Sequence, residues 1–190
     1  MIYPIVAIGD PVLRKKCKVI EPNYPALNTL VHDMFETMYE ANGVGLAAPQ
    51  IGLDVRVFVV DTEPFSHDEE LSHDEQLSLR DFKKVFINAE MIEESGEYWD
   101  FNEGCLSIPN IREDVSRRAQ ITIKYQDINF QVHIESYDGL VARVIQHEYD
   151  HIEGVLFTDK LSSLKKRLIR KRVQLISSGK VKTDYTMRFP

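Results

Sequence analysis

The stretch Gln146-His147-Glu148-Tyr149-Asp150-His151 has the form His-Glu-x-x-His and lies in a segment with helical periodicity. Residues four apart lie on one face of a helix, so His147 and His151 can offer two imidazole nitrogens to one metal ion. Glu148 then projects beside that metal, where it can exchange a proton with a bound water. The stretch therefore predicts a metal site that supports hydrolysis.

The helix that carries this motif is expected to span residues 138–153. Asp138 can cap its start, and Gly154 provides the left-handed residue that ends it. Leu140 and Val144 share the face of the two histidines at about 100° per residue. We therefore expect both histidines to point into the protein and not into bulk water.

The rest of the chain predicts an α+β fold. Apolar residues at three- and four-residue steps predict a helix over 25–42, and a β-branched run predicts a strand over 55–61. Further strands are expected at 85–88 and 92–101. Helices before and after a strand-rich middle favour antiparallel or mixed sheets packed around the helix of the motif.

Two features of the middle of the chain are predicted from its pattern. Alternating apolar residues predict a hairpin over 121–134 in which Val132 and Ile134 belong to the buried face and His133 faces solvent. The polar and acidic residues 63–83 predict a surface insertion that is mobile or partly helical.

A basic helix is expected at residues 162–177. Eight basic residues and no acid lie between Ser162 and Lys182. This charge suits contact with ribosomal RNA, and a solvated helix face accounts for it equally well. The leucines of this segment and Ile176 are expected to pack on the core.

Composition limits the class of protein. The 190 residues are 43% hydrophobic and 28% charged, which predicts one soluble domain over 1–190. The net charge of −7 argues against DNA binding. Cys17 and Cys105 form no disulfide framework, and we recognise no signal peptide or membrane span. We expect a cytoplasmic protein.

A catalytic metal site needs a third protein ligand and keeps one position open. A zincin-like peptidase takes that ligand from a downstream Glu or His. Here no histidine follows His151, and the only acids after it are Glu153, Asp159 and Asp184. Upstream, Glu103-Gly-Cys-Leu-Ser107 places Cys105 in a polar, glycine-kinked stretch. Cys105 is interpreted as a thiolate ligand, and a small buried apolar residue is the alternative interpretation.

Three separated stretches resemble the motifs of the peptide deformylases: Gly43-Val-Gly-Leu-Ala-Ala-Pro-Gln50, Glu103-Gly-Cys-Leu-Ser107 and Gln146-His-Glu-Tyr-Asp-His151. They occur in the order of that family. The helical C-terminal segment resembles the bacterial type with a helical end, whereas the insertion at 63–83 departs from its compact form. The resemblance implies metal-dependent removal of the formyl group from N-formylmethionine at the start of nascent proteins, with release of formate.

The resemblance implies roles for the residues of the metal site. Cys105, His147 and His151 would hold one divalent ion, with Fe²⁺ expected and Zn²⁺, Ni²⁺ and Co²⁺ also suited to these ligands. Metal-bound water would attack the formyl carbon, with Glu148 as general base and then general acid. The backbone N–H of Leu106 would stabilise the oxyanion together with the side chain of Gln50.

The resemblance also suggests residues that border the substrate. Gly43 and Gly45 would let the substrate pair with the backbone as an added strand. Val44, Arg143 and Val144 would border the pocket for the methionine side chain, and a solvated surface arginine is an equally good interpretation of Arg143.

Three alternatives stay open at this point. Gln50 is also readable as a polar residue at a strand entrance. The resemblance implies that Glu103 and Arg117 pair and brace the cysteine loop, but two unrelated surface charges would give the same pattern. A protein with a structural metal would generally need four protein ligands, and the chain offers three.

Overall fold

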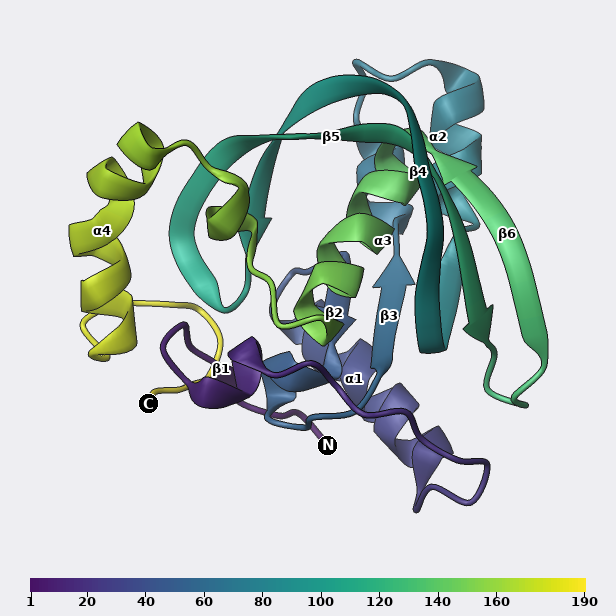
Figure 1. The fold of residues 1–190 in the computed structure, drawn as a ribbon, viewed down its shortest axis with the longest axis horizontal. Coiled ribbons are helices and arrows are strands. Elements are labelled where there is room, and N and C mark those ends of the chain that lie inside the picture. The colour runs from purple at the N-terminus through teal and green to yellow at the C-terminus, as the bar shows by residue number, and fades with distance from the viewer.

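Helix α3 (Gly139–Ile152), which carries the His-Glu-x-x-His motif, lies in the middle of the molecule (Figure 1). The computed structural model describes residues 1–190. The helix packs against four of the strands, β2, β3, β5 and β6, and buries Ala142, Ile145 and Ile152. Gly154 ends it with φ of +76°, as predicted, whereas Asp138 makes no side-chain hydrogen bond at its start.

The main sheet has five strands in the order β2-β3-β4-β5-β6, and every neighbouring pair is antiparallel. The strands are β2 (Gly45–Ala47), β3 (Val57–Asp61), β4 (Lys83–Cys105), β5 (Ile108–Gln126) and β6 (Val132–Asp138). Because helices cover this sheet, the predicted α+β fold is confirmed.

Strands β4 and β5 are long and curved, and they arch over α3 (Figure 1). The two strands predicted at 85–88 and 92–101 are one continuous strand in the structure. Its pairing with β5 shifts register at four places, one of them between Ile87 and Glu90. Such bulges bend a strand. They also interrupt the alternation of apolar and polar residues by which a strand is predicted from the sequence. The short turn between the strands presents Cys105 toward α3.

The predicted helices at 25–42 and 162–177 are confirmed as α1 (Leu27–Glu40) and α4 (Ser163–Ser177). The insertion at 63–83 lies between β3 and β4 and is partly helical, with α2 (His73–Arg80) capped by Ser72. Short 3₁₀ segments complete the helical structure: η1 (Pro11–Arg14), η2 (Ala48–Ile51), η3 (Glu63–His67) and η4 (Phe157–Lys160).

The predicted buried face of the hairpin is wrong on its second strand. Val132 and Ile134 are 58% and 64% exposed. His133 instead lies opposite buried Tyr125, and their rings stack with centroids 5.2 Å apart. Directly opposite residues of an antiparallel pair share a face. The register of β5 and β6, and not the apolar pattern of β6, therefore decides which side chains face inward.

The predicted apolar side of α4 is also wrong in part. Leu164, Leu168 and Leu175 are exposed, whereas Ile169 and Ile176 are buried. Ile169 and Ile176 lie seven residues apart on the face that packs against β5. The leucines form a second apolar row, and sequence alone does not tell which of two rows packs.

The two ends of the chain pair with each other. β1 (Ile5–Val6) and β7 (Met187–Arg188) form a parallel two-stranded sheet, and both ends of the chain lie on the lower side of the molecule in Figure 1. Met187 packs against two of the three apolar clusters that make the core. None of the helices has the length and apolar character needed to cross a bilayer.

Candidate active site

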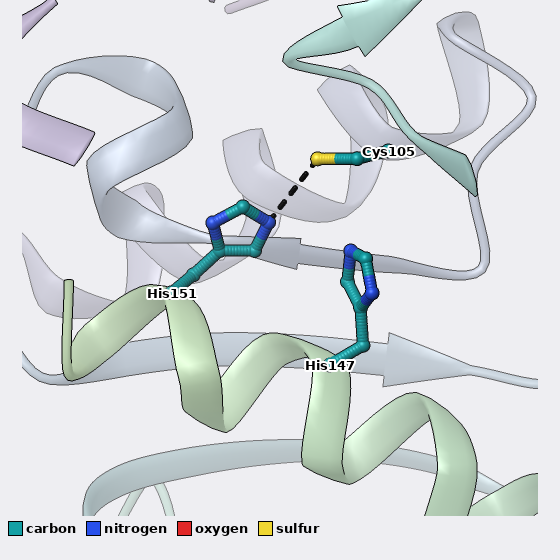
Figure 2. Close-up of side chains that lie close together, drawn as sticks. All are labelled: Cys105, His147 and His151. Carbon is teal, nitrogen blue, oxygen red and sulfur yellow. Dashed lines mark hydrogen bonds between the residues drawn. The ribbon is translucent and has the colours of Figure 1, made fainter. Parts of the chain in front are cut away.

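Three candidate metal ligands converge at the inner face of α3. One ligand atom from each of Cys105, His147 and His151 lies within 4.8 Å of the others. Figure 2 shows both imidazole rings rising from α3 toward Cys105, whose Sγ is 3.2 Å from Nε2 of His151. Burial lowers the pKa of His151 and keeps its ring neutral, the form that binds a metal. The three side chains therefore fit one divalent ion of the kind that accepts sulfur and nitrogen ligands.

A buried carboxylate orients the first histidine. Nδ1 of His147 lies 2.9 Å from Oε2 of Glu103, which leaves Nε2 of this ring for a metal. Burial disfavours the charged ring, but the sulfur of Cys105 and the carboxylate of Glu103 outweigh it and raise the pKa of His147.

Glu103 is the centre of a buried ion-pair network. Arg117 donates to both of its carboxylate oxygens at 2.7 and 2.9 Å, and Arg143 donates to it at 2.9 Å. Arg117 also reaches Asp150 at 2.7 Å. Burial opposes the charge of Glu103, but hydrogen bonds from His147 and Arg117 lower its pKa well below the usual range. The network ties the end of β4 to β5 and α3.

Glu148 is buried directly beside β2. A Cβ atom at Gly45 would lie 2.7 Å from Cγ of Glu148, so a larger residue would displace the carboxylate. Oε2 of Glu148 is buried without a hydrogen-bond partner in the protein. Burial raises the pKa of Glu148 to about 7. A carboxyl group with this pKa can both take up and release a proton near neutral pH.

Gln50 presents its amide group to Cys105. Its Oε1 accepts from the backbone N–H of Ala47 at 2.8 Å. Its Nε2 therefore faces Sγ of Cys105 at 3.6 Å and Oγ of Ser107 at 3.5 Å. The buried side chain is held by its oxygen, so its N–H groups are oriented in advance toward the metal site.

These groups open onto a cavity of about 490 Å³. Eleven residues predicted for the site line it: Gly43, Val44, Gly45, Gln50, Glu103, Cys105, Leu106, Arg143, Val144, His147 and Glu148. Arg117 and His151 are not among the lining residues. The cavity borders β2, which is an edge strand of the sheet.

Arg143 is not a solvated arginine. It is 2% exposed, and its guanidinium donates to Glu103 and to the backbone carbonyls of Val115 and Trp99. It also stacks over the ring of Trp99 at 4.3 Å. Its charged end therefore belongs to the network around Glu103, and only other parts of the side chain are available to the cavity.

Sequence reasoning missed three contributors to the site. Asp150 lies inside the motif, but its role as a second partner of Arg117 depends on the fold. Ser107 lies in the cysteine stretch, but its contact with the amide of Gln50 depends on the fold. Residues 182–185 line the cavity from the far end of the chain, and no pattern in their sequence predicts this.

The fold and the geometry of this site define a metal-dependent hydrolase. A family model described as polypeptide deformylase matches residues 2–167. The chain belongs to the polypeptide deformylase family, whose members remove the formyl group from nascent peptides.

Individual relatives support this assignment along the whole chain. The peptide deformylase of Christiangramia forsetii is 62% identical over 190 residues, covering 100% of this chain and 97% of the relative. That of Flavobacterium johnsoniae is 60% identical over 189 residues, covering 100% and 96%. The crystal structure of a peptide deformylase from Legionella pneumophila has a TM-score of 0.77 at 37% identity, covering 92% of this chain and 94% of that one.

Proposed function

We propose that this chain removes the formyl group from N-formylmethionine at the start of nascent peptides and releases formate. The observation that carries the proposal is the convergence of Cys105, His147 and His151 beside a cavity that Glu148 and Gln50 line next to an edge strand. We further propose that residues 1–190 act as one catalytic domain and work in the cytoplasm, where nascent chains are made.

Cys105, His147 and His151 would hold one divalent ion. We propose Fe²⁺ as the physiological ion, and Zn²⁺, Ni²⁺ and Co²⁺ suit the same ligands. When bound, such an ion supplies Lewis acidity and lowers the pKa of water to about 7. Metal analysis after anaerobic purification, with the activity of each reconstituted form, tests the choice. A fully active zinc form with no iron would contradict it.

Glu148 handles the proton of the reaction. Its carboxylate takes a proton from the attacking water and returns it to the departing amine. The pKa of about 7 that burial gives to Glu148 supports both transfers. Gly45 serves this step because it leaves the space that the carboxylate occupies.

Gln50 and Leu106 stabilise the negative charge that develops on the formyl oxygen. The side-chain amide of Gln50 and the backbone N–H of Leu106 donate to that oxygen. The hydrogen bond from Ala47 to Gln50 supports this role, because it fixes the amide before substrate binds. A donor held in place costs no reorganisation during the reaction.

The substrate backbone pairs with residues 43–45 as an added strand. This is supported by the position of β2 at the edge of the sheet and at the border of the cavity. Val44, Val144 and the aliphatic part of Arg143 border the methionine side chain. Glu103 and Arg117 support the site by holding His147 and the cysteine loop.

The test is formate release from formyl-Met-Ala-Ser, with the unformylated peptide as the matched control. We expect formate and free Met-Ala-Ser from the first peptide and no cleavage of the second. Cleavage of an internal amide without formate would instead indicate a zincin-like peptidase.

We also propose that α4 contacts the ribosome. Its exposed face combines Leu164, Leu168 and Leu175 with lysines and arginines, which suits a surface with phosphate groups. Replacing Lys171 and Arg172 by Glu should reduce co-sedimentation with ribosomes and leave turnover of the small peptide unchanged. Unchanged co-sedimentation would rule out the contact and favour a merely solvated helix.

A further inference from the structure

The segment after α4, residues 181–190, runs back to the active site and is here called the C-terminal strap. Lys182, Thr183, Asp184 and Tyr185 line the same cavity as the metal ligands. The strap is fixed on both sides of these residues. Nδ2 of Asn110 donates to the carbonyl of Lys182 at 3.2 Å, and β7 pairs with β1.

Tyr185 of the strap makes one hydrogen bond to the cysteine loop. Its hydroxyl donates to the backbone carbonyl of Leu106 at 2.8 Å. The ring is half-buried and packs against the core cluster that contains α1, β2 and β3 residues. The donor is therefore held by packing, and it contacts the residue that follows the ligand Cys105.

A second contact holds the next residue of the same loop. The carbonyl of Ser107 accepts from the backbone N–H of Ile8 at 2.9 Å. Ser107 is fully buried. The carbonyls of Leu106 and Ser107 are thus held by the C-terminal strap and by the segment just after β1, and these two parts of the chain are themselves paired.

We infer that Tyr185 is a positioning residue for the oxyanion donor on Leu106. The inference rests on the proposed function, because it assumes that the N–H of Leu106 meets the formyl oxygen. The carbonyl and the N–H of Leu106 belong to two adjacent peptide planes that meet at its Cα atom. Fixing the plane of the carbonyl limits the rotations at this Cα atom, and through them the direction of the N–H. The hydroxyl of Tyr185 makes no hydrogen bond to Cys105, His147 or His151, and its contact with the carbonyl of Leu106 makes it act through that residue.

The test removes only the hydroxyl. Tyr185→Phe keeps the ring in the core, and Tyr98→Phe, an exposed tyrosine on β4 outside the cavity, is the matched control. With formyl-Met-Ala-Ser we expect kcat of Tyr185→Phe to fall about tenfold while KM stays within about twofold. The control should match the wild type in both constants.

Hydrogen exchange of the peptide covering residues 103–110 gives a readout that does not depend on activity. We expect exchange in this peptide to be about fivefold faster in Tyr185→Phe than in the wild type or Tyr98→Phe. A kcat for Tyr185→Phe within twofold of the wild type would overturn the positioning role. If the wild type released no formate, the proposed function would fail. Equal exchange rates of the peptide 103–110 in Tyr185→Phe and Tyr98→Phe would overturn the inference about Tyr185, whatever the activity.

Discussion

Gly45 and Glu148 occupy adjoining space, so that any side chain at position 45 would meet the carboxylate: a Cβ atom there would lie 2.7 Å from Cγ of Glu148. Strand β2, which we expect to bind the substrate, therefore lies directly beside Glu148, which we expect to transfer the proton. Motifs more than ninety residues apart in the chain are coupled at this contact.

Gly45→Ala should reduce turnover because the added methyl group pushes Glu148 away from the cavity. We expect kcat to fall about 100-fold, since a displacement of about 1 Å is enough for this. Formate release measures it at equal metal content. Gly139→Ala is the control: its Cβ would meet nothing within 4 Å, although φ is +55°. This control should lose about 1 kcal/mol of stability and no activity.

Glu148→Gln separates metal binding from proton transfer. The amide has the shape of the carboxylate but cannot accept the proton, so kcat should fall about 10²- to 10⁴-fold. Metal content should stay at one ion per chain, because Glu148 is not one of the three converging ligands. Exposed Glu97→Gln is the control. Unchanged turnover of Glu148→Gln would indicate a metal that serves structure alone.

Glu103→Gln should weaken both the fold and the metal site. The change leaves the guanidinium groups of Arg117 and Arg143 without their shared counter-ion, in a buried place. We expect a loss of about 3–5 kcal/mol in the free energy of unfolding, measured with urea. Metal affinity should fall about 10- to 100-fold because His147 loses its partner.

The control for this change is Glu113→Gln. Glu113 lies opposite Glu103 in the strand register but pairs with Lys165 nearer the surface. Glu113→Gln should lower the free energy of unfolding by less than about 1 kcal/mol. Equal losses for the two variants would mean that the buried network contributes no more than a surface pair.

Glu135 should contribute to stability against acid. Burial opposes its charge, but hydrogen bonds from Lys84, Tyr137 and Tyr125 prevail and lower the pKa of Glu135 to about 2. A lowered folded-state pKa gives stability that is complete above the unfolded value near 4.5 and is lost as the pH falls toward 2. Because the carboxylate is partly exposed, we expect it to contribute only about 1 kcal/mol to the free energy of unfolding.

This contribution is measured as the difference between the wild type and Glu135→Gln in urea unfolding at several pH values. The difference should be present at pH 6 and should shrink between about pH 4.5 and pH 2. A constant difference over that range would show that the charge of Glu135 is not its source.

The parts of the site that sequence predicts are those set by local periodicity. His147 and His151 share a helix face because they are four residues apart, and the structure brings both rings to Cys105. What sequence could not supply is register. Bulges set which residues of β4 and β5 meet, and with them the pairing of Glu103 with Arg117, which the family resemblance implies but periodicity does not.

The burial of Arg143 could not be predicted from the sequence either, because it depends on the register of the strands. Its position on the helix is predictable, but its partners Glu103, Trp99 and Val115 come from two other strands. The exposure of Val132 and Ile134 also follows from register, since each lies opposite a polar residue, Gln126 or Lys124.

The pairing of β1 with β7 has a consequence for the order in which the molecule is completed. Residues 1–180, with all three candidate metal ligands, Glu148 and Gln50, are synthesised before the strap. The carbonyl of Leu106 meets its donor only when Tyr185 has emerged and β7 has joined β1. We therefore expect the cysteine loop of a chain still in synthesis to be held at one carbonyl only, and its positioning to be completed late in folding.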